Sequence, residues 1–408
     1  MSRRETRLQS PIYMDNHATT RVDPRVVEAM LPYFREHYGN AASTTHRFGH
    51  RAKEAVDAAR QSIAAAIGAR AREIVFTSGA TESNNLALRG VAERAGRKGK
   101  HLVSVATEHP SVLDPLDKLR RSGCEVTLLP VVPAPDARAG LLRPEQLAGA
   151  IRGDTVLVSV MLANNEIGAI QPLDQLAGVC RGKGVLLHSD ATQAVGKIPV
   201  DADRLGVDLM SFSAHKFFGP KGIGALYVRR RSPPIKLEPV LYGGGHESGL
   251  RSGTLNVPAI VGMARALELC LEEMAEETAR LRALRDRLYQ GLTASLKGVA
   301  LNGPAVSSPE WRLPGNLNLS FAGVEGETLL LSLADQVSLS SGSACTSATP
   351  EPSHVLRALA IGDEAVRSSV RFGLGRFNTA EEVELVIGLI AESVSRLRGM
   401  LGFSGLGG

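Results

Sequence analysis

The chain has 408 residues, 43% of them hydrophobic, which is enough to bury a large core and excludes a disordered chain. Its formal net charge is +5, from 47 basic and 42 acidic residues. The short basic clusters RVDPR, RKGK and VRRR lack interleaved aromatics, a pattern that disfavours nucleic-acid binding. No apolar run follows the basic start MSRRETRLQS, so we expect neither a secretory signal nor a membrane span.

Apolar runs typical of strands alternate with helical stretches over residues 15–260. The runs are IVFTS, HLVSVA, EVTLLPVV, TVLVSVML, GVLLHS, DLMSFS and GALYV. This alternation predicts an α/β fold with one open, mostly parallel sheet, helices on both faces and a site at the carboxyl ends of the strands. The long charged stretch 257–296 predicts helices that leave this domain. We therefore expect a large domain over 15–260 and a smaller one over 261–408.

The segment IVFTSGATESNNLAL predicts a phosphate site. Its strand breaks at Gly79 and its helix begins near Thr81, so free backbone N–H groups and the positive end of the helix would meet a phosphate there. An ordinary capped turn is the alternative.

Two further strands end in side chains suited to a pyridine ring. HLVSVATEH delivers His109, which could lie against an aromatic ring or move protons. VLLHSDATQAVGK delivers Asp190 and then Gln193. A carboxylate there could keep a pyridinium nitrogen protonated, as in pyridoxal phosphate enzymes, while the amide could bond the ring hydroxyl. Singly, a buried His can bond a carbonyl, and such an Asp can be a helix cap.

Lys216 ends the apolar run of DLMSFSAHK, just before the glycines of FFGPKGIG. An amine at the carboxyl end of a strand lies in a crevice and is able to form an imine with a carbonyl group. A predicted strand precedes each of four features: the phosphate cradle at Gly79, His109, Asp190 and Lys216. That order favours a pyridoxal phosphate site over four unrelated coincidences.

The chain resembles the cysteine desulfurases, pyridoxal phosphate enzymes of the class V aminotransferase group. The likeness covers nearly the whole chain and rests on PIYMDNHATTRVDP, GNAASTTHRFG, NNEIGAIQP, SDATQAVGK, SFSAHK, RSGTLN, SSGSACTS and VRFGLGRF. It implies the fold type I of these enzymes, with residues 1–14 joining the smaller C-terminal α/β domain. It also implies that Asn165 contacts the ring or substrate and that Ser213, His215, Ala80 and Thr81 surround the phosphate.

The resemblance further implies a homodimer, because Thr254 of RSGT would reach a phosphate in the neighbouring subunit. Arg371 of VRFGLGRF would bind the substrate α-carboxylate, with Arg376 as the alternative. The familiar form of this motif has Ser where this chain has Gly373, so a hydroxyl is missing beside Arg371.

Cys345 lies in LSSGSACTSATPEPSH, a run of small polar residues with one Gly and two Pro that predicts a mobile loop. A loop thiol suits the transfer of sulfur from a cofactor to a partner. Cys124, Cys180 and Cys270 lie in apolar or helical surroundings that predict structural roles. No CxxC spacing occurs, so we expect no metal site.

These features predict a cysteine desulfurase that holds its cofactor on Lys216, moves protons with the help of His109 and leaves a persulfide on Cys345. A reducing compartment, the cytoplasm, is expected because the thiol must carry sulfur. The expected partners are sulfur-acceptor proteins that serve iron–sulfur, cofactor or nucleic-acid modification pathways. Relatives devoted to iron–sulfur cluster assembly often carry a longer tail that contacts the scaffold protein. The Gly-rich tail GMLGFSGLGG of this chain does not resemble it, which argues against docking to that scaffold.

Three alternatives stay open at this stage. The first is another enzyme of the same fold, a selenocysteine lyase or an aminotransferase, although a plain aminotransferase has no use for Cys345. The second is a sulfur-relay subunit that turns over only when a partner activates it. The third, a nucleic-acid-binding module, is suggested by the net charge alone.

Overall fold

A computed structural model describes residues 11–96, 99–231, 233–341 and 352–400. Within them, each of the seven predicted runs forms a strand of one sheet, ordered β2-β8-β7-β6-β5-β3-β4. Only β8 runs antiparallel to its neighbours in that sheet, so the prediction of a mostly parallel sheet is confirmed. The strands are β2 (Ile74–Thr77), β3 (His101–Val105), β4 (Glu125–Leu129), β5 (Thr155–Ser159), β6 (Leu186–Asp190), β7 (Leu209–Ser213) and β8 (Gly224–Val228).

Most of these strands are apolar throughout because both faces of the sheet are covered. Alternate residues of a strand point to opposite faces, so Phe76 and Phe212 join one buried cluster while Val75 and Leu209 join another. The helices α4 (Ala80–Ala95) and α5 (Pro110–Arg121) supply the second cluster, and α3 (Arg47–Ala66) and α7 (Leu173–Lys183) supply the first. The prediction of helices on both faces is therefore confirmed.

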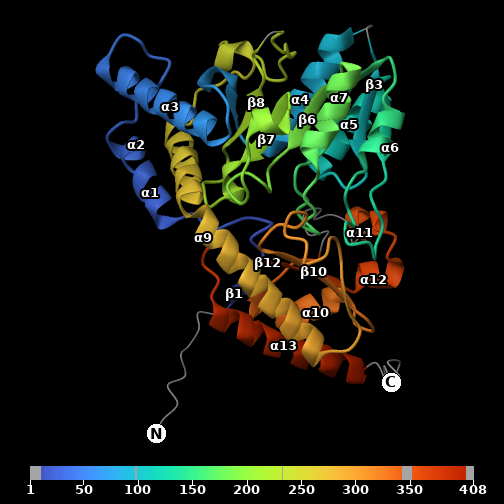
Figure 1. Ribbon diagram of the computed structural model, residues 1–408. Coiled ribbons are helices and arrows are strands. Elements are labelled where there is room, and N and C mark those ends of the chain that lie inside the picture. Colours follow the sequence, from blue (N-terminus) through green and yellow to red (C-terminus); the bar gives the residue numbers. More distant parts are fainter. Residues whose placement is uncertain (1–10, 97–98, 232, 342–351, 401–408) are drawn as a thin grey trace.

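The stretch 257–296 forms one long helix rather than several. This helix, α9 (Val257–Ser295), begins after its N-cap Asn256, whose side chain accepts a hydrogen bond from the backbone N–H of Ala259. Figure 1 shows α9 passing from α1 (Pro24–Met30) and α3, beside the large sheet, to the lower layer that contains α13 (Ala380–Met400). No helix in the described ranges is long and apolar enough to cross a bilayer.

The lower layer contains a second, antiparallel sheet of order β12-β10-β9. A parallel pair joins β1, near the start of the described chain, to β11. The apolar faces of α9, α10 and α13 pack on these strands in a separate cluster. The bounds are β1 (Ile12–Tyr13), β9 (Val299–Leu301), β10 (Asn316–Phe321), β11 (Val337–Ser338), β12 (Ser369–Gly373) and α10 (Gly326–Leu333).

Short helices complete the described chain. They include α2 (Pro32–Arg35), α6 (Pro144–Ala150), α8 (Ala202–Leu205), α11 (His354–Ala358), α12 (Asp363–Arg367) and the 3₁₀ turns η1 (Ala71–Glu73), η3 (Ala214–Lys216) and η4 (Glu247–Gly249). We propose the domain division expected above, 15–260 against 261–408 with 1–14. Along α9 the upper cluster extends to Cys270 and the lower one begins at Leu281, so this helix belongs to both cores.

Candidate active site

A cavity of about 480 Å³ opens at the carboxyl ends of the parallel strands, where sheets of this type bind their ligands. It brings together nine of the predicted site residues from segments far apart in the chain. These are Ala80, Thr81, His109, Asn165, Asp190, Gln193, Ser213, His215 and Lys216.

Asp190, the last residue of β6, is held by two hydrogen bonds. The backbone N–H of Thr192 donates to its Oδ1 over 2.9 Å, and Nδ2 of Asn84 donates to its Oδ2 over 2.8 Å. Asn84 lies on α4 with no exposed surface and also donates to the hydroxyl of Ser111 over 2.9 Å. Helix α4 therefore aims the Asp190 carboxylate through Asn84.

His109 is the N-cap of α5, and this role fixes its tautomer. Its Nδ1 accepts a hydrogen bond of 3.1 Å from the backbone N–H of Ser111. Since Nδ1 is an acceptor, the ring proton of the neutral imidazole lies on Nε2. Burial lowers the pKa of His109, and Lys216 and His354 act in the same direction while Asp190 opposes them. His109 is thus a neutral donor at neutral pH.

The loop before α4 leaves backbone donors open at the position predicted for an anion. Gly79 is the N-cap of this helix and has no side chain to cap its first N–H groups, which leaves them for a ligand. A Cβ at Gly224 of β8 would lie 2.7 Å from the Cα of Gly79, so a glycine is needed there for the loop to approach the sheet. Ser213 and His215 line the cavity from the end of β7.

Lys216 lies in η3 directly after β7, and its Nζ donates to two backbone carbonyls. The distances are 2.8 Å to the oxygen of His17 and 2.6 Å to that of Ala18. The carbonyl of His17 also accepts a 2.8 Å hydrogen bond from Nε2 of Gln193. The N-terminal segment thus closes the cavity around Lys216.

Arg371 lies on β12, behind the wall of the cavity, and its side chain is 1% exposed. One Nη donates to Asp15 over 2.8 Å and the other to the backbone carbonyl of Asn165 over 3.1 Å. Its Nε has no hydrogen-bond partner among the described residues. Arg371 therefore touches the Asn165 segment but is not among the residues that line the cavity.

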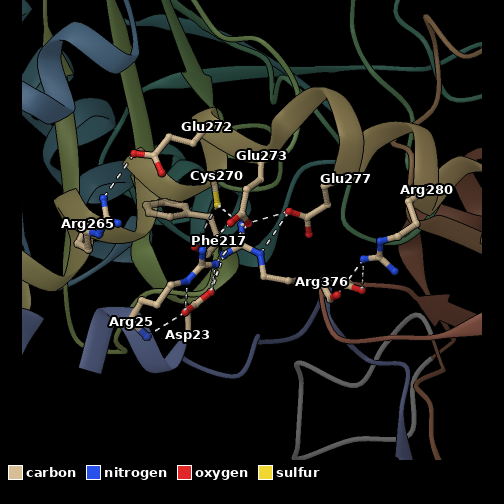
Figure 2. Close-up of polar contacts among 11 residues, drawn as sticks. Asp23, Arg25, Phe217, Arg265, Cys270, Glu272, Glu273, Glu277, Arg280 and Arg376 are labelled. Atoms are coloured by element: carbon tan, nitrogen blue, oxygen red, sulfur yellow. Dashed lines mark hydrogen bonds and ion pairs between the residues drawn. The ribbon is translucent and has the colours of Figure 1, made fainter. Parts of the chain in front are cut away.

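Arg376, the alternative carboxylate ligand, is bound to acidic side chains (Figure 2). It donates to Asp23 over 2.8 Å and to Glu277 of α9 over 3.1 Å. It also donates to Sγ of Cys270, which in turn donates to the carbonyl of Phe217, each over 3.5 Å. Burial raises the pKa of the Cys270 thiol to about 12. The contacts of Arg376 hold α9 to the N-terminal segment.

Comparison with known proteins identifies the family. Residues 12–386 match the model of the class-V aminotransferases. A protein named cysteine desulfurase IscS, from Anaeromyxobacter dehalogenans, is 55% identical over 393 residues, 96% of this chain and 95% of that protein. The chain belongs to the cysteine desulfurase family.

Solved structures with sequences similar to this chain have the same fold. A NifS-like protein is 39% identical with a TM-score of 0.86 and covers 95% of this chain and all of its own. A second structure, SspA in complex with cysteine, is 32% identical with a TM-score of 0.77 and covers 90% of this chain and all of its own. The prediction of fold type I is confirmed.

Enzymes of this family use pyridoxal 5′-phosphate, and so does this protein. The residues of the cavity fit this group. It offers an uncapped helix start for the phosphate, a carboxylate on Asp190 for the ring nitrogen and an amine on Lys216 for the aldehyde carbon. His109 supplies an imidazole of the neutral form.

The predicted residues that remain are Arg371, described above, Cys345 and Thr254. Cys345 lies outside the described residues. Thr254 is exposed and is not among the described residues that line the cavity. The sequence reasoning missed Asn84, Ser111 and the carbonyl of His17. Asn84 belongs to the TESNN segment, and His17 belongs to the DNHATT motif. Neither motif shows which residue its side chain or carbonyl would contact.

Proposed function

We propose that this protein is a cysteine desulfurase that converts L-cysteine to L-alanine and leaves the sulfur as a persulfide on Cys345. The C–S bond of the substrate breaks, an S–S bond forms to Cys345, and the thiol proton of Cys345 balances the new C–H bond of alanine. The single observation that carries this proposal is the meeting of Lys216, Asp190 and His109 in one cavity, in a chain 55% identical to a desulfurase.

The cofactor, when bound, supplies an electron sink for the carbon atom that loses its proton. The first N–H groups of α4, with Ser213 and His215, would hold its phosphate, and Asp190 would keep its ring nitrogen protonated. Asn84 and the backbone of Thr192 keep the Asp190 carboxylate in one orientation, so this partner is preorganised.

Two side chains handle protons in the cavity. The Nζ of Lys216 is held by the carbonyls of His17 and Ala18, and it would take a proton from the substrate α carbon and return it. His109 presents Nε2–H, because its Nδ1 is occupied by Ser111. It can therefore donate a hydrogen bond or a proton without first changing tautomer.

Arg371 is our proposed partner for the substrate α-carboxylate, together with Asn165. Its guanidinium contacts the backbone of Asn165, which lines the cavity, and its Nε has no partner in the described parts of the chain. The ion pair of Arg376 with Asp23 and Glu277 argues against Arg376 in this role, since a substrate would have to displace two carboxylates.

The remaining expectations are part of the same proposal. Sulfur-acceptor proteins take the persulfide sulfur, and the protein works in the cytoplasm. We also propose a homodimer in which Thr254 completes the phosphate site of the neighbouring subunit, supported by its exposure on its own subunit. Sedimentation of wild type and Thr254→Val, with cofactor affinity for each, tests the dimer. A monomer with full affinity contradicts it.

Purified wild type and Cys345→Ala would be compared for cofactor colour and for alanine and sulfide released from L-cysteine with a reducing thiol. Cys124→Ala is a matched control, since this thiol is half-buried. Cofactor colour in all three proteins, with alanine formation lost in Cys345→Ala alone, is expected. Alanine formation at the wild-type rate by Cys345→Ala contradicts the thiol role. A keto acid in place of alanine makes the protein an aminotransferase.

A further inference from the structure

Lys197 lies behind the cofactor cavity, in the segment that follows β6. Its Nζ donates a 2.5 Å hydrogen bond to Oε1 of Gln193. Nε2 of Gln193 donates in turn to the carbonyl of His17 over 2.8 Å, and the same carbonyl accepts from Lys216. A continuous chain of hydrogen bonds therefore connects Lys197 to the amine at the centre of the site.

This chain decides which way the Gln193 amide points. A lysine ammonium only donates, so the amide atom that faces it must be the oxygen. The NH₂ group then lies on the other side, where one hydrogen bonds His17 and the second is left for the cavity that Gln193 lines. A flipped amide would place its oxygen against the His17 carbonyl and its NH₂ against the ammonium, and both contacts are repulsive.

We propose that Lys197 is a positioning residue for the cofactor: it locks Gln193 so that the amide donates a hydrogen bond into the cavity. The acceptor of matching chemistry is the phenolic oxygen of the cofactor ring. Lys197 itself is not among the residues that line the cavity, so it acts through Gln193. This inference rests on the use of pyridoxal phosphate and not on cysteine as the substrate.

The surroundings of Lys197 make its charge sensitive to pH. Burial lowers its pKa to about 7, and the positive charges of Lys216 in η3 and Arg371 in β12 act in the same direction. Glu277 and Cys270, both on α9, oppose this shift. The buried imidazole of His17 also lies near, and its own pKa is lowered by burial and by Lys197. A neutral amine can still donate to Gln193, and the carbonyl of His17 still requires the NH₂ group on its side, so the orientation of the amide persists above neutral pH.

The test compares Lys197→Met with wild type and with Lys183→Met, a control at the exposed end of α7. Apo protein is titrated with pyridoxal phosphate, and the absorption of the bound cofactor is followed against pH. Without the Lys197 amine that holds Gln193, the affinity for the cofactor should fall about tenfold. In wild type, the hydrogen bond to the ring oxygen and the nearby positive charge of Lys197 both disfavour protonation of the bound cofactor. Lys197→Met weakens both effects, so the pH midpoint of the absorption change should rise by about one unit. Lys183→Met should match wild type in both.

A double-mutant cycle with Gln193→Met tests the route of the effect. If Lys197 acts through Gln193, adding Lys197→Met to Gln193→Met should change cofactor affinity less than twofold. Full additivity of the two losses overturns the inference. So does a Lys197→Met protein that has wild-type affinity and midpoint but unfolds at a lower temperature, which would be a purely structural role.

The failure of this inference is distinct from that of the proposed function. A wild-type protein that shows no cofactor band overturns both together. A normal band in wild type with unchanged behaviour of Lys197→Met overturns the positioning role alone and leaves desulfurase chemistry in place.

Discussion

Nδ2 of Asn84 lies 2.8 Å from Oδ2 of Asp190 and joins helix α4 to the end of β6. One helix therefore supplies, at its start, the N–H groups proposed to hold the phosphate and, one turn later, the amide that orients Asp190. The same amide nitrogen reaches Ser111, beside the Nδ1 of His109. The groups proposed to meet the phosphate, the ring nitrogen and the ring face are thus fixed relative to each other.

Replacement of Asn84 by Ala should weaken pyridoxal phosphate binding about tenfold, because Oδ2 of Asp190 loses its buried donor. Asn85→Ala is the matched control, since Asn85 bonds the Thr81 carbonyl of its own helix. Titration of both apo proteins with the cofactor measures the difference. Equal affinities would show that Asn84 does not hold Asp190.

Replacement of Arg371 by Met should raise KM for L-cysteine by about 10- to 100-fold, the range of lost charge-assisted hydrogen bonds. The cofactor spectrum should stay, since Arg371 is not among the residues that line the cofactor cavity. Arg376→Met should instead lower Tm with KM changed less than about twofold. Steady-state kinetics and thermal unfolding of both variants test this, and the opposite pattern would make Arg376 the substrate ligand.

Asp23→Asn should lower the free energy of unfolding at pH 7 by about 3 kcal/mol, because Arg376 loses a buried partner. The side-chain hydrogen bond from Arg25 is the main cause that holds the pKa of Asp23 below its usual value. The stabilisation is present above the pKa of the unfolded state and is lost as pH falls through that of the folded state. Urea unfolding at pH 7 and at low pH measures the difference in free energy of unfolding between wild type and Asp23→Asn. If this difference does not shrink in acid, the account is contradicted.

Glu166 should show the opposite dependence on pH. Burial raises its pKa to about 7, while Ser353 and Arg371 oppose the shift. The stability that it contributes is present below the unfolded pKa and is lost as pH rises through about 7. Glu166→Gln should therefore exceed wild type in free energy of unfolding by about 3 kcal/mol at pH 8 and equal it at pH 4. Urea unfolding of wild type and Glu166→Gln at both pH values measures this difference. Glu364→Gln, at an exposed position on α12, is the control. A pH-independent difference would contradict the assignment.

Gly373→Ser, which introduces the residue expected at this position from the resemblance, should destabilise this protein. A Cβ at Gly373 would lie 2.9 Å from the backbone nitrogens of Asn16 and His17, so the N-terminal segment would have to move. The expected cost is about 1–3 kcal/mol, read from Tm. Gly388→Ser on α13 is the control, because nothing lies within 4 Å of a Cβ there. An unchanged Tm for Gly373→Ser would show that the segment yields freely.

The sequence alone determined the large sheet, its buried faces and the strand ends that carry Asp190 and Lys216. These features depend on local apolar runs and on the glycines that end them, such as Gly79, and such patterns are written in consecutive residues. The family motifs also pointed to the cofactor residues before the structure placed them in one cavity.

Only the tertiary structure decided how distant segments meet. The carbonyl of His17 contacts Lys216 and Gln193 across about half the chain, and a backbone oxygen leaves no trace in residue identity. In the same way, Arg371 and Arg376 look equivalent in VRFGLGRF. They differ because strand β12 turns one toward Asn165, while the chain after the strand carries the other to Asp23 and α9. Contacts of this kind depend on packing between elements, which no single segment encodes.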